Sequence, residues 1–142
     1  MRVKDLMTPN AEGIQSSATV KEAAHRMKDL NVGALPVFDG NNEAGMITDR
    51  DIVIRSIAGD LNPSNTSVGE IMSKEIKWCE EEDSLEKAAE IMENYRVRRL
   101  LVKDSTGMPT GVISLGDIAV RGEKQVGGEV LQRVSMPDRP ER

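Results

Sequence analysis

The chain contains 142 residues with a net charge of −5, and its 38% hydrophobic and 30% charged residues are typical of one compact globular domain or two small packed halves. The negative charge argues against non-specific binding to DNA or RNA, because such binding requires a basic surface that displaces counterions. No apolar stretch is long enough to cross a membrane, and the single cysteine excludes an internal disulfide, so we expect a cytoplasmic protein that contacts neither membrane nor nucleic acid.

The predicted elements begin with a short helical turn that ends near Met7, followed by an extended segment over 13–16. Apolar residues at helical spacing then predict a helix over 20–30. Thr19 and Glu22 have the spacing of a capping box, in which the hydroxyl accepts from a helical amide and the carboxylate returns a contact. We therefore place the start of this helix at Thr19.

A strand is expected next over 34–38, followed by a turn over 39–42 that is rich in Asp, Asn and Gly. A further strand over 45–48 leads directly into another helix. A polar linker over 60–66, interrupted by proline, then ends the first half of the chain. These elements follow the order β-α-β-β-α.

The second half of the chain repeats the first. Met7 corresponds to Met72, and after one inserted residue Asp51 corresponds to Asp117. The match stays in register across nearly the whole repeat, so it predicts a duplicated fold. The corresponding elements are an extended segment over 76–79, a helix whose apolar residues run from Leu85 to Met92, strands over 99–102 and 111–114, and a turn over 104–109.

The sequence therefore predicts an α/β fold of two pseudo-symmetric β-α-β-β-α repeats. We assign 1–59 to the first repeat, 60–66 to the linker and 67–121 to the second repeat. Residues 122–142 form a C-terminal tail, which we expect to be partly disordered or to contain a short helix around 129–134.

The residues that point most directly to a function lie where the last strand of each repeat meets the following helix. There Thr48 precedes Asp51, and Ser114 precedes Asp117, with the same spacing. A hydroxyl at the start of a helix, beside unpaired amides, suits a phosphate oxygen. A carboxylate one turn later can accept hydrogen bonds from the two hydroxyls of a ribose. The pattern therefore indicates a nucleotide site.

The same spacing is also that of a capping box, which needs no ligand. A single copy would favour the capping interpretation, because short motifs give many false positives. Two copies at equivalent positions of a repeat favour a ligand site instead.

Three motifs carry a resemblance to a known family: the pattern Gly-apolar-apolar-Thr/Ser-x-x-Asp, the Leu-Met-Thr opening at 6–8, and the Val-Gly-Ala-Leu-Pro-Val segment at 32–37. They resemble the CBS domain, and their duplication resembles a CBS pair (Bateman module) over about residues 3–121. The Gly-Ala-Leu-Pro-Val and Thr-Asp-Arg-Asp-Ile-Val segments resemble small stand-alone bacterial CBS-pair proteins of the hypoxic response protein type. The resemblance implies two clefts between the repeats that bind adenosine compounds, and a disc-like homodimer of two pairs.

The resemblance also implies which residues line these clefts. Thr48 and Ser114 would meet phosphate, and Asp51 and Asp117 would hold the ribose. The residues expected to contact the adenine are Gly33, Ala34, Leu35 and Pro36 and their counterparts Arg98, Arg99 and Leu100. Thr8 and Ser73 would line the cleft.

The two halves differ at the expected adenine wall. Leu101 stands in the second copy where the family usually has proline, and Arg98 and Arg99 stand where the first copy has small residues. The two clefts are therefore expected to be unequal. Either arginine is suited to pair with a phosphate, or to form an ion pair on a solvated surface.

Metal binding and catalysis find little support in the sequence. His25 and Cys79 are the only histidine and cysteine, so no metal site with the usual nitrogen and sulfur ligands can form within one chain. We expect Cys79, at the end of a predicted strand, to be a small buried apolar residue. No nucleophile with an adjacent base is evident, so we expect neither catalytic residues nor a catalytic cofactor.

We therefore expect a regulatory adenine-nucleotide sensor without enzymatic activity, which binds AMP, ADP or ATP and signals through conformational change, a homodimer or an unidentified protein target. Two alternatives stay open: a protein-interaction module with empty clefts, and a binder of S-adenosylmethionine or NAD. The first alternative predicts no stabilisation by nucleotides. The second predicts dependence on Asp51 and Asp117 without a preference for phosphate.

Overall fold

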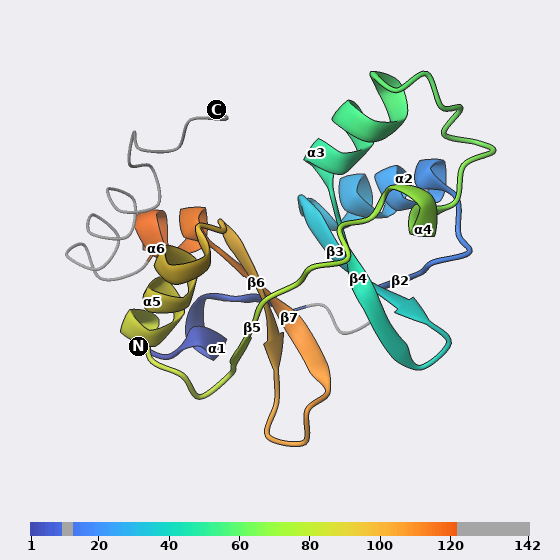
Figure 1. Cartoon of the computed structure of the whole chain (residues 1–142). Helices are drawn as coiled ribbons and strands as arrows, with labels where there is room; N and C mark the ends of the chain where they lie inside the picture. The colour runs from blue at the N-terminus through green and yellow to red at the C-terminus, as the bar shows by residue number, and fades with distance from the viewer. Residues whose placement is uncertain (10–12, 122–142) are drawn as a thin grey trace. The chain divides into compact units, whose positions relative to one another are not determined.

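The computed structural model describes residues 1–9 and 13–121 and shows a mixed α/β chain that folds into two compact units (Figure 1). We name them the central unit, Asn10–Ile76, and the C-terminal unit, which joins Met1–Pro9 to the chain from Lys77 onward. The short helix expected around 129–134 lies outside the described residues. Within the described ranges, no helix has the length and apolar character that crossing a membrane requires.

The central unit is built on a three-stranded sheet with helices beside it. Its elements in chain order are β2 (Ile14–Gln15), α2 (Val20–Leu30), β3 (Ala34–Asp39), β4 (Asn42–Thr48), α3 (Asp49–Asp51), η1 (Ile52–Ile57) and α4 (Val68–Ile71), of which η1 is a π-helix. The sheet order is β2-β3-β4, with β2 parallel to β3 and β3 antiparallel to β4.

The C-terminal unit repeats this plan with one additional strand. Its elements are α1 (Val3–Leu6), β1 (Thr8–Pro9), β5 (Trp78–Glu80), α5 (Leu85–Tyr95), β6 (Arg99–Lys103), β7 (Pro109–Ser114) and α6 (Leu115–Arg121). The sheet order is β1-β7-β6-β5, with β5 parallel to β6 and β7 antiparallel to both β6 and β1. The expected α/β fold of two similar repeats is confirmed.

The equivalent helices α2 and α5 begin and end in the same way. The hydroxyl of Thr19 accepts a hydrogen bond from the Glu22 amide at 3.1 Å, and Ser84 caps α5 in the same manner. The return contact from the Glu22 side chain, which the expected capping box requires, is absent from the contacts of the described residues. Each helix ends at a residue in the left-handed region, Asn31 or Arg96. The duplicated sequence thus fixes both ends of the helix by local contacts.

Each compact unit contains the opening segment of the other sequence repeat. The Ser73 amide and carbonyl pair with Met46 at 2.8 and 2.9 Å, which joins the start of the second repeat to β4. In the other unit, Thr8 of β1 pairs with Val112 of β7. The compact units therefore differ from the sequence repeats assigned to 1–59 and 67–121, because each repeat exchanges its first short helix.

The two hydrophobic cores follow the same exchange. The core of the central unit consists of Ile14, Val20, Ala23, Met27, Leu35, Val37 and Ile47, together with Val68 and Ile71 from α4. The core of the C-terminal unit consists of Cys79, Leu85, Ala88, Met92, Leu100, Val102, Ile113, Leu115 and Ile118, together with Val3 and Leu6 from α1. Burial of these apolar side chains holds each opening helix in its unit, since a fully buried Val, Leu or Ile contributes about 1.5–3 kcal/mol.

Two glycines, Gly45 on β4 and Gly111 on β7, allow the opening segments to lie close to these strands. A Cβ atom at Gly45 would lie 2.4 Å from the Ser73 carbonyl oxygen, and one at Gly111 would lie 2.5 Å from the Thr8 carbonyl oxygen. Neither contact can be relieved by a side-chain rotation, because both oxygens belong to the backbone. Glycine at these positions therefore serves the approach of a neighbouring strand.

We expect Gly45→Ala and Gly111→Ala each to lower the free energy of unfolding by roughly 1–3 kcal/mol, because the added methyl group overpacks a backbone contact. Chemical denaturation monitored by circular dichroism measures the change. Gly116→Ala is the control, because a Cβ there would meet only the Ser114 hydroxyl at 3.6 Å and alanine favours the helix. A loss as large for Gly116→Ala as for the other two variants would contradict the steric explanation.

Candidate functional site

The two predicted Thr/Ser–Asp pairs lie at equivalent strand-to-helix junctions. Thr48 ends β4 and is the N-cap of α3, which closes with Asp51. Ser114 ends β7, and Asp117 lies in the first turn of α6. The sequence folds this way because each strand leaves its sheet at a hydroxyl residue that can cap the helix after it.

Both pairs form reciprocal capping boxes. The Asp51 amide donates to the Thr48 hydroxyl at 3.1 Å, and the Thr48 amide donates to Oδ2 of Asp51 at 2.9 Å. The corresponding distances between Ser114 and Asp117 are 3.0 and 2.9 Å. The capping role is thus realised in both copies. Each hydroxyl retains its own proton for donation, and each carboxylate retains further acceptor positions, so capping and ligand binding are compatible.

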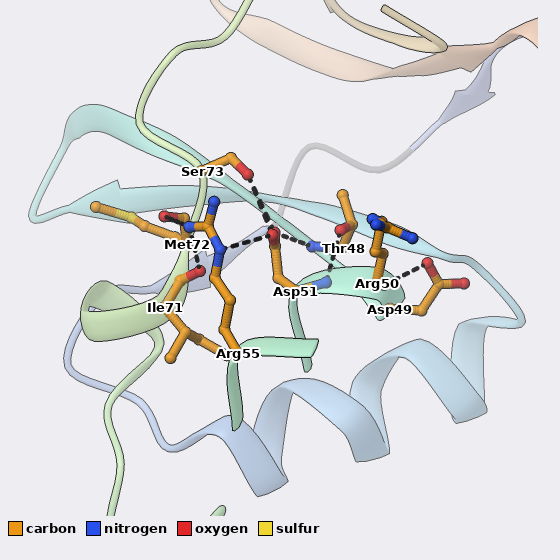
Figure 2. A network of polar contacts seen from close by, with 8 residues as sticks. All are labelled: Thr48, Asp49, Arg50, Asp51, Arg55, Ile71, Met72 and Ser73. Carbon is orange, nitrogen blue, oxygen red and sulfur yellow. Dashed lines mark hydrogen bonds and ion pairs between the residues drawn. The ribbon is translucent and has the colours of Figure 1, made fainter. Parts of the chain in front are cut away.

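Asp51 also joins the junction to the opening segment of the second repeat (Figure 2). The Ser73 hydroxyl lies 3.2 and 3.3 Å from the two carboxylate oxygens of Asp51. Nε of Arg55 lies 3.8 Å from Oδ1, and Nη1 of Arg55 donates to the carbonyl oxygens of Ile71 and Met72 at 3.1 and 3.2 Å. The structure therefore brings Ser73, from the far side of the linker, to Asp51 and Arg55, which lie one helical turn apart.

The candidate adenine wall of the central unit lies on the strand beside Thr48. Ala34 is paired with Thr48 in the β3–β4 register, and the Asp49 amide donates to the Gly33 carbonyl at 2.9 Å. Leu35, by contrast, is fully buried in the core of the central unit. Its side chain therefore faces away from Ala34, because successive side chains on a strand alternate between faces. Pro36 is also buried and lies on the same face of β3 as Ala34.

The C-terminal unit places its candidates in the same pattern. Arg99 is paired with Ser114 in the β6–β7 register, and the Leu115 amide donates to the Arg98 carbonyl at 2.8 Å. Leu100 is fully buried in the core of this unit. Thr8, the counterpart of Ser73, lies in β1 next to β7.

The two junctions carry different cations. Arg99 stands opposite Ser114, where the central unit has Ala34 opposite Thr48. Conversely, Arg50 lies in the first turn of α3 on the exposed surface beside Thr48, where α6 has Gly116 (Figure 2). Arg50 and Arg55 are not among the site residues that the sequence predicts. The signal for Arg50 was its position inside the Thr-Asp-Arg-Asp motif.

Two hollows on the central unit lie along α2, each with a volume of about 440 Å³. One is lined by Gly13, Ile14, Gln15, Ser17, Ala18, Glu22 and Arg26, and the other by Glu22, His25, Arg26, Asp29 and Leu30. Neither includes Thr48 or Asp51. These hollows therefore do not coincide with the predicted site.

Cys79 is a buried core residue, as expected. Only 3% of its surface is exposed, and it belongs to the core of the C-terminal unit. Burial, followed by the charges of Asp83 and Glu80, raises the pKa of its thiol to about 12. Among the described residues, no group of three or more His, Cys, Asp and Glu side chains has the arrangement of a metal site.

The CBS domain model matches the chain twice, over 3–57 and 68–122. The CBS domain-containing protein YhcV of Bacillus subtilis is 37% identical over 134 residues, which cover 94% of each protein. A solved structure of hypoxic response protein I with two coordinated zinc ions superposes with a TM-score of 0.68 at 30% identity, covering 84% of this chain and 97% of that one. CBSX2 in complex with AMP superposes with a TM-score of 0.63 at 25% identity, covering 83% and 93%.

The raised pKa of Cys79 predicts slow reaction with thiol reagents. Because the pKa is raised, the thiol stays protonated at pH 8 in the folded protein, whereas an unfolded cysteine with a pKa of about 8.5 is partly thiolate. We expect 5,5′-dithiobis(2-nitrobenzoate) to react at least about 1,000-fold more slowly with native protein than with protein in guanidinium chloride. Comparable rates in the two conditions would show that Cys79 is accessible.

Proposed function

The chain belongs to the CBS-domain family, and we propose that it is a regulatory module that senses AMP, ADP or ATP without catalysing a reaction. Pairs of CBS domains are generally regulatory, non-catalytic modules that bind nucleotides. The observation that carries the proposal is the duplicated Thr/Ser–Asp junction, with hydroxyl and carboxylate held in the same geometry in both units. The AMP complex of CBSX2 supports the choice of an adenine nucleotide.

The proposed ligand would make three kinds of contact at each junction. Its phosphate would meet Thr48 or Ser114 at the start of the helix, where amides and the helix dipole favour an anion. Its ribose hydroxyls would donate to Asp51 or Asp117. The adenine would lie along the start of β3, at Gly33, Ala34 and Pro36, or of β6, at Arg98 and Arg99, with Ser73 or Thr8 at the margin. Leu35 and Leu100 would contact the ligand only through their backbone atoms, because their side chains are fully buried.

The junction of the C-terminal unit is the better candidate for the first ligand. Among the residues whose side chains the structure describes, only Ser114 donates a hydrogen bond to the Asp117 carboxylate, through its backbone amide. Asp117 is half-buried. Asp51 is only 6% exposed and already accepts from Ser73. Arg99, opposite Ser114 in the strand register, would add a cation suited to a phosphate.

A homodimer would give such a module a route for its signal. Val53, Ile54 and Ile57 are 56%, 49% and 57% exposed on η1, which is unusual for three large aliphatic residues on one short helix. We propose that this face associates with a second copy of the chain. Nucleotide binding would then shift the population of dimer conformations by its differential affinity for them. With its single buried cysteine, the protein would work in the reducing cytoplasm.

A second candidate function is a protein-interaction module that binds no nucleotide. The exposed aliphatic face of η1 favours it, because such a face suits a protein partner equally well.

The nucleotide proposal predicts ligand-dependent stabilisation. At a hundredfold excess over its dissociation constant, AMP, ADP or ATP should raise the free energy of unfolding by about 2.7 kcal/mol. Thermal unfolding with each nucleotide, and with S-adenosylmethionine and NAD, measures the shift. Asp117→Ala should remove most of it, and the double variant with Asp51→Ala should remove all of it. Asp29→Ala, at an exposed position on α2, is the matched control and should respond like the wild type.

No shift with any of the five compounds would favour the interaction module. A shift that survives in the double variant would place the ligand elsewhere on the chain.

The dimer proposal predicts that a charge on η1 dissociates the assembly. Ile54→Asp should convert dimer to monomer in sedimentation velocity, because an unpaired carboxylate would be buried in the interface. Met108→Asp is the control, since Met108 is 60% exposed on the β6–β7 hairpin. A dimer that resists Ile54→Asp, or one disrupted equally by Met108→Asp, would exclude η1 as the dimer face.

A further inference from the structure

Asp51 is the only buried charged side chain among the residues that the structure describes. A charge removed from water in this way must be compensated by hydrogen bonds or an opposite charge. The structure supplies both from within the chain: the Thr48 amide at 2.9 Å, the Ser73 hydroxyl at 3.2 Å, and the Arg55 guanidinium at 3.8 Å.

These internal partners leave little room for a ligand. A carboxylate offers about four acceptor positions on its two oxygens. The Thr48 amide takes one of them, the Ser73 hydroxyl lies within bonding distance of both oxygens, and Arg55 approaches Oδ1. A ribose would bring two further O–H donors to the same carboxylate. The Ser73 hydroxyl and the Arg55 guanidinium therefore compete with these two donors for the oxygens of Asp51.

Arg55 is held at Asp51 by contacts of its own (Figure 2). Nη1 of Arg55 donates to the carbonyl oxygens of Ile71 and Met72 at 3.1 and 3.2 Å. These carbonyls lie at the end of α4, where a helix leaves its last carbonyls without intrahelical partners. The guanidinium thus connects the carboxylate of Asp51 to the opening helix of the second repeat.

We propose that Arg55 and Ser73 are internal competitors for Asp51, which a nucleotide must displace to bind at the junction of the central unit. This proposal rests on the proposed function, because it takes the ligand to be an adenine nucleotide that uses Asp51. The apparent affinity of this junction is lowered by the fraction of molecules in which Asp51 is internally paired. Displacement also frees the Arg55 guanidinium from Asp51, so that occupancy is transmitted to its two contacts at the end of α4.

The test measures the affinity of this junction for AMP after the other junction has been disabled. Isothermal titration calorimetry with AMP compares Asp117→Ala with the double variant Asp117→Ala/Arg55→Gln. We expect the added Arg55→Gln substitution to tighten binding about tenfold, because the loss of one competing contact of ordinary strength corresponds to that change. A structural role alone would not increase affinity.

Lys87→Gln in the same Asp117→Ala background is the matched control. Lys87, on α5, forms an ion pair of the same sequence spacing at 4.0 Å with Asp83, which precedes the helix, and neither residue belongs to a nucleotide junction. Its removal should leave AMP affinity unchanged. Affinity that is unchanged or weaker with Arg55→Gln, or increased equally with Lys87→Gln, would overturn the proposal.

The wild type and the single variant Arg55→Gln separate this proposal from the proposed function. Binding of two AMP molecules to the wild type, with the weaker site tightened about tenfold in Arg55→Gln, supports both. Binding of AMP only after Arg55→Gln, and only with Asp51 intact, supports competition while refuting nucleotide sensing by the wild type. Equal stoichiometry with unchanged affinity supports sensing and refutes competition, and the absence of binding in every variant refutes both.

A second variant that keeps the positive charge tests the proposal in case Arg55→Gln does not fold. Arg55→Lys retains a cation but is not expected to reach Asp51 and both carbonyls at once, because the three N–H donors of an ammonium group project from one nitrogen, whereas Arg55 uses Nε and Nη1. Circular dichroism establishes that each variant is folded. If Arg55→Gln unfolds, Arg55→Lys should still tighten AMP binding about threefold over Asp117→Ala alone, and an unchanged affinity would overturn the proposal.

Discussion

The close backbone contact at Gly45 and Gly111 is the constraint on which both junctions depend. Each glycine lets the opening segment of the other sequence repeat lie directly against a strand, with the Ser73 or Thr8 carbonyl where a side chain would otherwise stand. At Gly45 this contact delivers the Ser73 hydroxyl to Asp51. Ser73, which follows the linker, thus completes the candidate site of the central unit. Main-chain hydrogen bonds to Met46 hold Ser73 there, in addition to side-chain packing.

Capping and binding share the same atoms at these junctions. The Thr48–Asp51 and Ser114–Asp117 pairs close their helices by reciprocal hydrogen bonds, which orient each hydroxyl and carboxylate before any ligand arrives. Such orientation reduces the entropy that binding must remove. The two interpretations of the motif that the sequence leaves open are therefore complementary in physical terms: the cap positions the groups that a nucleotide would use.

Duplication of the sequence does not make the two junctions equal. The central unit buries its carboxylate among internal partners and presents Arg50 on the exposed first turn of α3. The C-terminal unit leaves Asp117 half-buried and places Arg99 across the strand from Ser114. Under the proposed function, this difference in how fully each carboxylate is paired would let one chain respond to a nucleotide at two concentrations.

The sequence by itself determined the duplicated β-α-β-β-α order, the start of the first long helix at Thr19, and the two Thr/Ser–Asp junctions, because these features depend on residues within one turn or one strand of each other. The exchange of opening segments, the burial of Asp51 and its contact with Arg55 and Ser73 were decided only by the tertiary structure. The contacts of Ser73 with Asp51, and of Arg55 with Ile71 and Met72, join residues on either side of a linker. The Asp51–Arg55 pair itself has the spacing of one helical turn, but local periodicity does not predict which distant backbone segment will pack against a glycine.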